Sequence, residues 1–392
     1  MSKIINVIQQ SQQWEPKLVA LRRQLHQIPE ISPHLSQTKS LIINALADFP
    51  LKRRKVKHHH SLCFDLKGRK KGPTIILCAS MDGSSLKEHA NHQFCSQILG
   101  QSHALAHDFQ MSCLVNTLQL LSQYKDHISG TVRAIFLAGE QDHSGAIDII
   151  QSHLLEHAEL AFSLDFDHHI ESGIVEYQYG ISKPRVDEIT LEYIDRNQQE
   201  KTCYYQNNPV DMATQLTHEI PQLLRQEFGA LTPLSLNFTQ LNAGEANNFQ
   251  PSFIRINGRL YSFSHDNATN AIQFLQQVMK HRFNDDETNV IATRLCPPLE
   301  NNTTWLNYVL STLNQIKTSN QVQEQIRPRL IGDGFAHFNL VLPCVKLNIG
   351  CMDSNHQNRV CEKALVDGMM ILSNMISKHL MVDSDNIILG KF

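Results

Sequence analysis

The sequence lacks the hydrophobic runs of a membrane protein, because none of its apolar stretches approaches the roughly 18 residues that a membrane-spanning helix needs. Its first residues, Met1-Ser2-Lys3, do not lead into the long apolar core of a secretory signal. The chain also lacks a strong excess of basic charge, since its formal net charge is -3, which argues against a general nucleic-acid binder. We therefore expect a cytoplasmic protein with neither a membrane nor a nucleic acid as its partner.

Cysteine pairs at metal-binding spacing are missing too. The nine cysteines are scattered, odd in number and include no Cys-x-x-Cys pair. This pattern favours reduced, mostly buried thiols over a zinc ribbon or a disulfide framework. A cysteine hydrolase is also disfavoured, because no cysteine lies beside a matching histidine and acid motif.

What the sequence does contain is an alternation of helices and buried strands. Apolar side chains at helical spacing in residues 12–48, interrupted at Pro29 and Pro33, predict two helices with a break between them. Short apolar runs that end in polar residues predict buried strands over residues 74–83, 131–141 and 160–165. This order of elements predicts an α/β fold class.

A second pattern begins near residue 183. Alternating apolar and polar residues there predict strands, and longer apolar periods predict helices, in the order strand, helix, strand, strand, helix. The first pattern returns afterwards, so this α+β sandwich is predicted to be an insertion. The chain would then consist of one domain at 1–182 and 294–392 and an inserted domain at 183–293.

Residues 102–108, Ser-His-Ala-Leu-Ala-His-Asp, are the segment most typical of a functional site. They lead directly into the apolar run of a predicted helix, and Asp108 is in position to cap it. His103 and His107 lie at the same helix start, where metal ligands or acid–base groups are commonly presented. The segment therefore indicates a metal site.

This segment resembles the His-Ala-Cys-Gly-His-Asp motif of the amidohydrolase branch of metallopeptidase family twenty, which includes aminoacylases, hippurate hydrolases and indole-acetyl amino acid hydrolases. Residues 21–30 and 243–251 are similar to two further signatures of that family, the first of which implies a structural role for His26. The resemblance implies a zinc-peptidase-like catalytic domain, a mixed sheet flanked by helices. It also implies that the inserted domain is a lid that forms a homodimer.

The resemblance implies two adjacent metal ions at five positions, which in this chain are Leu105, His107, Gln141, Asp165 and His356. Leu105 stands where the family has a bridging cysteine, Gln141 where it has a carboxylate, and Asp165 where it has a histidine. Two cations roughly 3.5–4 Å apart repel each other unless they share an anionic bridge, and leucine cannot provide one. We therefore expect at most one zinc or manganese ion, or none.

The resemblance also assigns roles to residues that do not hold metal. Glu140 would be the general base that activates water, and Asp82 would orient a metal ligand. In the inserted domain, Asn248 is retained at a substrate-binding position, whereas Gln199 stands where the family has an oxyanion-stabilising histidine. The ligand implied by this arrangement is an N-acyl amino acid or a small peptide.

Three functions fit these observations. The first is a degenerate relative that retains the substrate pocket but hydrolyses little. The second is an active single-metal amidohydrolase with Glu140 as base, whose third metal ligand would be His103, His168 or His169. The third is a non-catalytic interaction protein that uses its dimer surface and the basic run at 52–60 to contact a macromolecular partner.

Overall fold

The computed structural model describes residues 9–58, 61–89, 93–139, 142–195, 208–245, 252–283, 287–325, 329–353 and 360–381. The chain divides into two compact units. The first comprises the described residues of Met1–Ser182, Glu300–Arg327 and Gly334–Phe392, and the second those of Lys183–Leu299 and Pro328–Asp333. The second unit begins at the residue predicted for the inserted domain and extends past the predicted end at 293.

The first unit is built on an eight-stranded mixed sheet. In sheet order its strands are β1 (Lys52–Arg54), β2 (Leu62–Lys67), β4 (Ser129–Leu137), β3 (Lys70–Ser80), β5 (Ala158–Glu171), β14 (Cys344–Met352), β6 (Val175–Tyr177) and β13 (Val322–Glu324). The four central strands β4, β3, β5 and β14 run parallel, so their carboxyl ends lie at the same edge of the sheet. This edge carries the candidate site.

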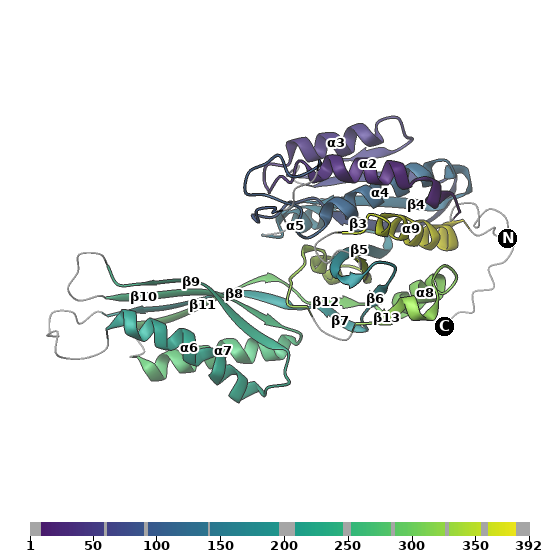
Figure 1. Cartoon of the computed structure of the whole chain (residues 1–392). Helices are drawn as coiled ribbons and strands as arrows, with labels where there is room; N and C mark the ends of the chain where they lie inside the picture. The colour runs from purple at the N-terminus through teal and green to yellow at the C-terminus, as the bar shows by residue number, and fades with distance from the viewer. Residues whose placement is uncertain are drawn as a thin grey trace. The chain divides into compact units, whose positions relative to one another are not determined.

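The helices of this unit are α2 (Glu15–His26), α3 (Ser36–Leu46), α4 (His107–Ser122), α5 (Ser144–Gln151), α8 (Thr303–Leu313) and α9 (Ala364–Leu380), with short 3₁₀ turns η1 (Lys125–His127), η4 (Ser319–Gln321) and η5 (Gly334–Leu340). Helix α4 packs against α2, α9 and strands β3 and β5 (Figure 1). Nearly all of its side chains are buried. It is thus a central core helix, and its first residue lies at the candidate site.

The apolar runs of the central strands are buried on both faces. Ile75, Ile76 and Leu77 of β3 are fully buried, as expected for a parallel strand that is covered on both sides. The two predicted amino-terminal helices correspond to α2 and α3, and the residues between them include Pro29 and Pro33, which disfavour a continuous helix.

The second unit is a four-stranded antiparallel sheet with two helices on one face (Figure 1). Its strands in order are β11 (Thr288–Cys296), β8 (Arg185–Ile194), β10 (Phe253–Ser262) and β9 (Leu234–Ala243), and its helices are α6 (Pro209–Phe228) and α7 (His265–Arg282). A two-stranded ladder of β7 (Gly180–Lys183) and β12 (Leu299–Asn301) lies at the boundary of the units in the sequence. Buried residues such as Ile189 and Leu191 alternate along β8 and join a separate core with α6 and α7.

These features confirm the predicted α/β fold class, with a mixed sheet flanked by helices and a separate sheet-rich unit. Strand β11 is an addition to the predicted order of elements, because its mostly exposed side chains give little apolar signal. The roles of the second unit as a lid and in a homodimer stay predictions. In the part of the chain that the structure describes, no helix has the length and apolar character needed to cross a membrane.

Candidate functional site

The structure describes four of the nine predicted site positions. Asp82, Leu105, His107 and Asp165 belong to the first unit. The other five lie outside the described residues: Glu140, Gln141, Asn248, Gln199 and His356. Their predicted roles therefore stay predictions.

His107 is the first residue of α4 and is oriented as a metal-binding histidine would be. Its ring Nδ1 lies 2.7 Å from the main-chain oxygen of Asp82. A carbonyl oxygen can only accept, so Nδ1 carries the proton and the lone pair of neutral imidazole is on Nε2. Among the described residues, no hydrogen-bond partner of Nε2 is found. The side chain is buried and presents a single donor atom for a ligand.

Asp82 follows strand β3 and contacts His107 through its main chain. Its carboxylate Oδ1 accepts a hydrogen bond from the Ser32 N–H at 2.9 Å. Asp82 therefore helps to orient His107 through its main-chain carbonyl, while its carboxylate contacts the segment between α2 and α3. The role predicted for the Asp82 carboxylate, to orient a metal ligand, stays a prediction.

Asp165 lies on β5 and is paired with a lysine. Its Oδ1 lies 2.7 Å from Lys346 Nζ and accepts a second hydrogen bond from Gln110 Nε2 at 3.1 Å. Lys346 comes from the neighbouring strand β14 and is only 5% exposed. The Lys346 ammonium also lies 5.7 Å from the centroid of the Phe335 ring. A buried cation thus contacts the carboxylate that was predicted to bind metal.

Gln110 connects three elements around this ion pair. Its Oε1 accepts the N–H of Ser80, the last residue of β3, at 2.9 Å, while its Nε2 donates to Asp165. Because Gln110 is on α4, one helical turn after His107, it links the helix to the ends of β3 and β5. The amide therefore fixes the position of the Asp165 carboxylate.

The described residues do not fit a dinuclear metal centre. Leu105 is 40% exposed and has no atom that can bridge two cations. Asp165 already compensates the charge of Lys346. Within the described ranges, three potential ligands come together only in Asp167, His168 and His169, at the exposed end of β5.

Among the described residues, none of the three candidates for a third ligand forms a group of ligand atoms with His107 and Asp165. His168 and His169 group with Asp167 and not with Asp165. His103 is buried, its ring centroid lies 6.3 Å from that of His26, and burial lowers the pKa of His103 to about 4, against a smaller opposing effect of Asp108. Burial therefore favours the neutral form of His103, which is also the form that binds metal ions.

Asp108 does not cap α4, contrary to the prediction. The residue before the helix, Ala106, makes no side-chain cap, and Asp108 lies inside the first turn. Its fully buried carboxylate is 2.7 Å from Arg22 Nε and 2.8 Å from His26 Nδ1. Burial raises the pKa of Asp108, but the Arg22 charge and the His26 hydrogen bond outweigh that effect and hold the pKa well below its usual range.

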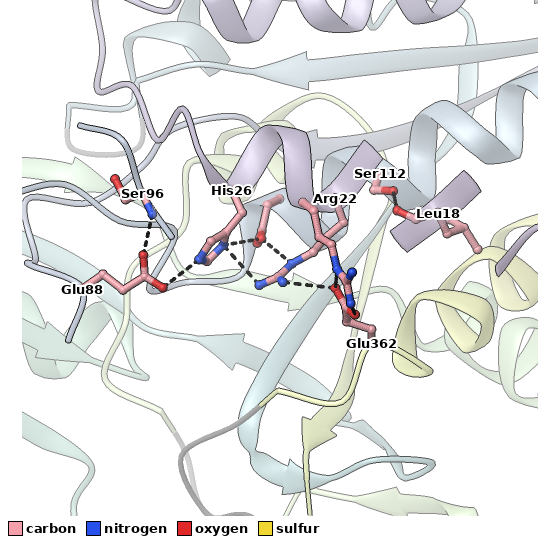
Figure 2. Close-up of polar contacts among 9 residues, drawn as sticks. Leu18, Arg22, His26, Glu88, Ser96, Ser112 and Glu362 are labelled. Carbon is pink, nitrogen blue, oxygen red and sulfur yellow. Dashed lines mark hydrogen bonds and ion pairs between the residues drawn. The ribbon is translucent and has the colours of Figure 1, made fainter. Parts of the chain in front are cut away.

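The Asp108 contacts are part of a larger ion network drawn in Figure 2. Arg22 extends from Asp108 to Glu362, and His26 Nε2 lies 3.0 Å from Glu88 Oε1. The other Glu88 oxygen accepts the N–H of Ser96 at 2.7 Å. This network supports the structural role predicted for His26, because it ties α2 to the loop that precedes the candidate site.

Sequence reasoning missed the most informative residue of the site, Lys346. A signal was present, since Lys346 and Asn348 are polar residues inside the apolar segment that forms β14. No local pattern in the sequence, however, indicates which carboxylate a buried lysine will contact. Gln110 was missed for the same reason.

Comparisons with known proteins agree with the sequence motifs. No protein-family model matches the chain. The chain is 25% identical over 249 residues to the N-acetyl-L-cysteine deacetylase of Bacillus subtilis, a match that covers 64% of the chain and 60% of that relative. It is 21% identical to thermostable carboxypeptidase 1 of Saccharolobus solfataricus over 382 residues, 92% of the chain and 93% of the relative.

Solved structures show the same fold. The YXEP protein of Bacillus subtilis, a dinuclear metal-binding peptidase of the M20 family, superimposes with a TM-score of 0.78 at 20% identity and covers 94% of this chain and 99% of its own. A Staphylococcus aureus protein described as an aminohydrolase superimposes with a TM-score of 0.84 at 18% identity. The match covers 97% of this chain and 100% of that protein's chain. The resemblance to metallopeptidase family twenty is thereby confirmed, and the chain is a relative, in sequence and in fold, of the amidohydrolases and peptidases of the M20 family.

Proposed function

We propose that the protein is a relative of the M20 amidohydrolases that binds an N-acyl amino acid or a small peptide but hydrolyses it weakly or not at all. The single observation that carries this proposal is the buried contact of 2.7 Å between Lys346 Nζ and Asp165 Oδ1. It places a protein cation on a carboxylate that a catalytic metal ion would need. The ligand class is supported by the names of the relatives, which include an N-acyl-L-amino acid amidohydrolase of Geobacillus stearothermophilus.

Weak hydrolysis follows from what amide cleavage requires. Water attacks an amide slowly unless a base removes its proton and a positive group stabilises the developing oxyanion. In metallohydrolases the metal ion serves both steps. With Leu105 at the bridging position and Lys346 bound to Asp165, the described residues leave His107 as the remaining oriented donor.

Binding and turnover can be measured separately. We expect N-acetyl-L-cysteine and other N-acetyl amino acids to raise the melting temperature of the protein, while the free amino acids do not, because binding to the folded state stabilises it. Amine release should stay at the uncatalysed level with or without added zinc or manganese. Rapid amine release that disappears in Glu140→Gln would contradict the proposal.

A second function, a single-metal amidohydrolase, is favoured by the orientation of His107. Its Nδ1–H bond to the Asp82 carbonyl leaves Nε2 available to a metal ion. This alternative predicts one equivalent of bound zinc or manganese that is lost in His107→Ala, together with chelator-sensitive amine release. Metal content by mass spectrometry on protein purified without a His tag separates the two functions.

A further inference from the structure

Lys346 places a positive charge where the family resemblance expects a metal ion. We infer that its ammonium group is a resident cation, which replaces a metal ion at Asp165 and keeps divalent metals out of this part of the centre. The inference rests on the proposed function, a centre that hydrolyses weakly or not at all. It adds that the Lys346 ammonium group is the cause of this weak hydrolysis. It concerns metal exclusion and does not depend on which ligand the protein binds.

The strand register brings the two residues together. Strands β5 and β14 are parallel neighbours, with Lys346 opposite Ser163 and Asn348 opposite Asp165. Lys346 is therefore two residues before the position opposite Asp165, and its long side chain reaches the carboxylate. The side chain of Lys346 is 4% exposed and that of Asp165 is 18% exposed. Little water is available to screen the contact.

A metal ion at Asp165 would compete directly with this ammonium group. A carboxylate binds zinc at roughly 2.0–2.2 Å, so the ion would lie close to an Nζ atom that is 2.7 Å from the same carboxylate oxygen. Like charges at that separation repel strongly when solvent is largely excluded. The hydrogen bond from Gln110 to Asp165 does not involve Lys346 and still holds the carboxylate when Lys346 is removed. Loss of the lysine should therefore expose a usable metal ligand.

The chain offers a matched control pair in the same unit. Lys317 Nζ lies 2.7 Å from Asp367 Oδ1, with side-chain exposures of 7% and 19%. This pair has the geometry and burial of the Lys346–Asp165 pair, but neither of its residues falls on a metal-ligand position of the family motif. Removing Lys317 should cost comparable stability without creating a metal site.

The experiment compares Lys346→Met with Lys317→Met. Both are placed in a His168→Ala/His169→Ala background, which removes the exposed Asp167 group that could bind metal by itself. Zinc and manganese binding is measured by titration calorimetry and by metal content after desalting. We expect Lys346→Met to bind metal roughly 100-fold more tightly than the parent, because the repulsion between the Lys346 ammonium group and the metal ion is lost. Lys317→Met should match the parent, and adding Asp165→Asn should abolish the gain.

Two outcomes would overturn the inference. One is a Lys346→Met protein that binds metal no better than Lys317→Met, and the other is a parent that already holds metal through Asp165. If Lys346→Met does not fold, Asp165→His and Asp165→His/Lys346→Met decide the question, because the double variant removes both charges of the pair. Metal binding must then appear in the double variant alone. Stabilisation of the parent by N-acetyl-L-cysteine tests the proposed function independently.

Discussion

At the scale of single residues, Ala106 has a backbone conformation that suits glycine. Its φ of 53° lies in the left-handed region, and the corresponding residue of the family motif is glycine. For a residue with a Cβ atom this conformation costs about 1–2 kcal/mol. We expect Ala106→Gly to raise the free energy of unfolding by up to about 1 kcal/mol, since the flexibility of glycine in the unfolded chain offsets part of the relief.

Urea denaturation checks this effect against Ala45→Gly, which lies in helix α3. That control should lose about 0.5–1 kcal/mol, because glycine is unfavourable inside a helix. Opposite signs for the two variants are the expected result. Equal destabilisation would mean that the backbone at residue 106 is not strained by its alanine.

The helix start predicted from the motif is confirmed, because His107 is the first residue of α4. Its ring donates a hydrogen bond to the main-chain carbonyl of Asp82, a contact that the motif does not specify. The pairing of Asp165 with Lys346 was not predictable, because it depends on which strands become neighbours in the sheet. Local spacing contains no information on such long-range contacts.

At the scale of elements, the ion network joins α2 to α4 and should make stability depend on pH (Figure 2). Burial lowers the pKa of His26, but its hydrogen bond to Asp108 and the charge of that carboxylate outweigh this, so the pKa is raised. The Arg22 charge opposes protonation, whereas Glu88 favours it. The folded protein therefore holds this proton more tightly than the unfolded chain.

The stabilisation from His26 should be complete below the unfolded pKa of about 6.5 and should be lost as the pH rises through the raised folded pKa. Urea denaturation at several pH values from 6 upward measures this loss. We expect His26→Gln to reduce the decline in stability with rising pH, while His127→Gln, at an exposed histidine of η1, leaves it unchanged. If the free energy of unfolding of His26→Gln declined with rising pH as steeply as that of the unaltered protein, His26 would not be the cause of the decline.

The elements themselves were largely predictable from periodicity. Helices α2 and α3 and strand β3 occur where apolar spacing placed them, because each buries the face that its pattern defines. The helix cap predicted for Asp108 is wrong, since Arg22 and His26 bind this carboxylate more favourably than an amino-terminal N–H group would. Strand β11 was missed because an exposed edge strand has little apolar alternation.

At the scale of the whole molecule, each unit has its own hydrophobic core. Leu118 of α4 is fully buried in the first core, and Leu275 of α7 is fully buried in the second. We expect two transitions in differential scanning calorimetry. Leu118→Ala should lower the temperature of one transition and Leu275→Ala that of the other. Truncation of a buried leucine to alanine typically reduces the free energy of unfolding by about 2–5 kcal/mol. If either substitution lowered both transitions equally, the units would unfold as one cooperative body.

The Lys346–Asp165 pair also constrains how the protein can change over generations. Loss of either partner alone removes the 2.7 Å contact that compensates the charge of the other. Breaking a buried ion pair in this way typically costs about 3–5 kcal/mol, a large part of the stability of a domain. Under the proposed function, a descendant that gained a metal ion at Asp165 would have to pass through such a destabilised intermediate or change both positions together. The two positions should therefore covary among descendants of this chain, and a metal ion would be difficult to acquire here by single substitutions.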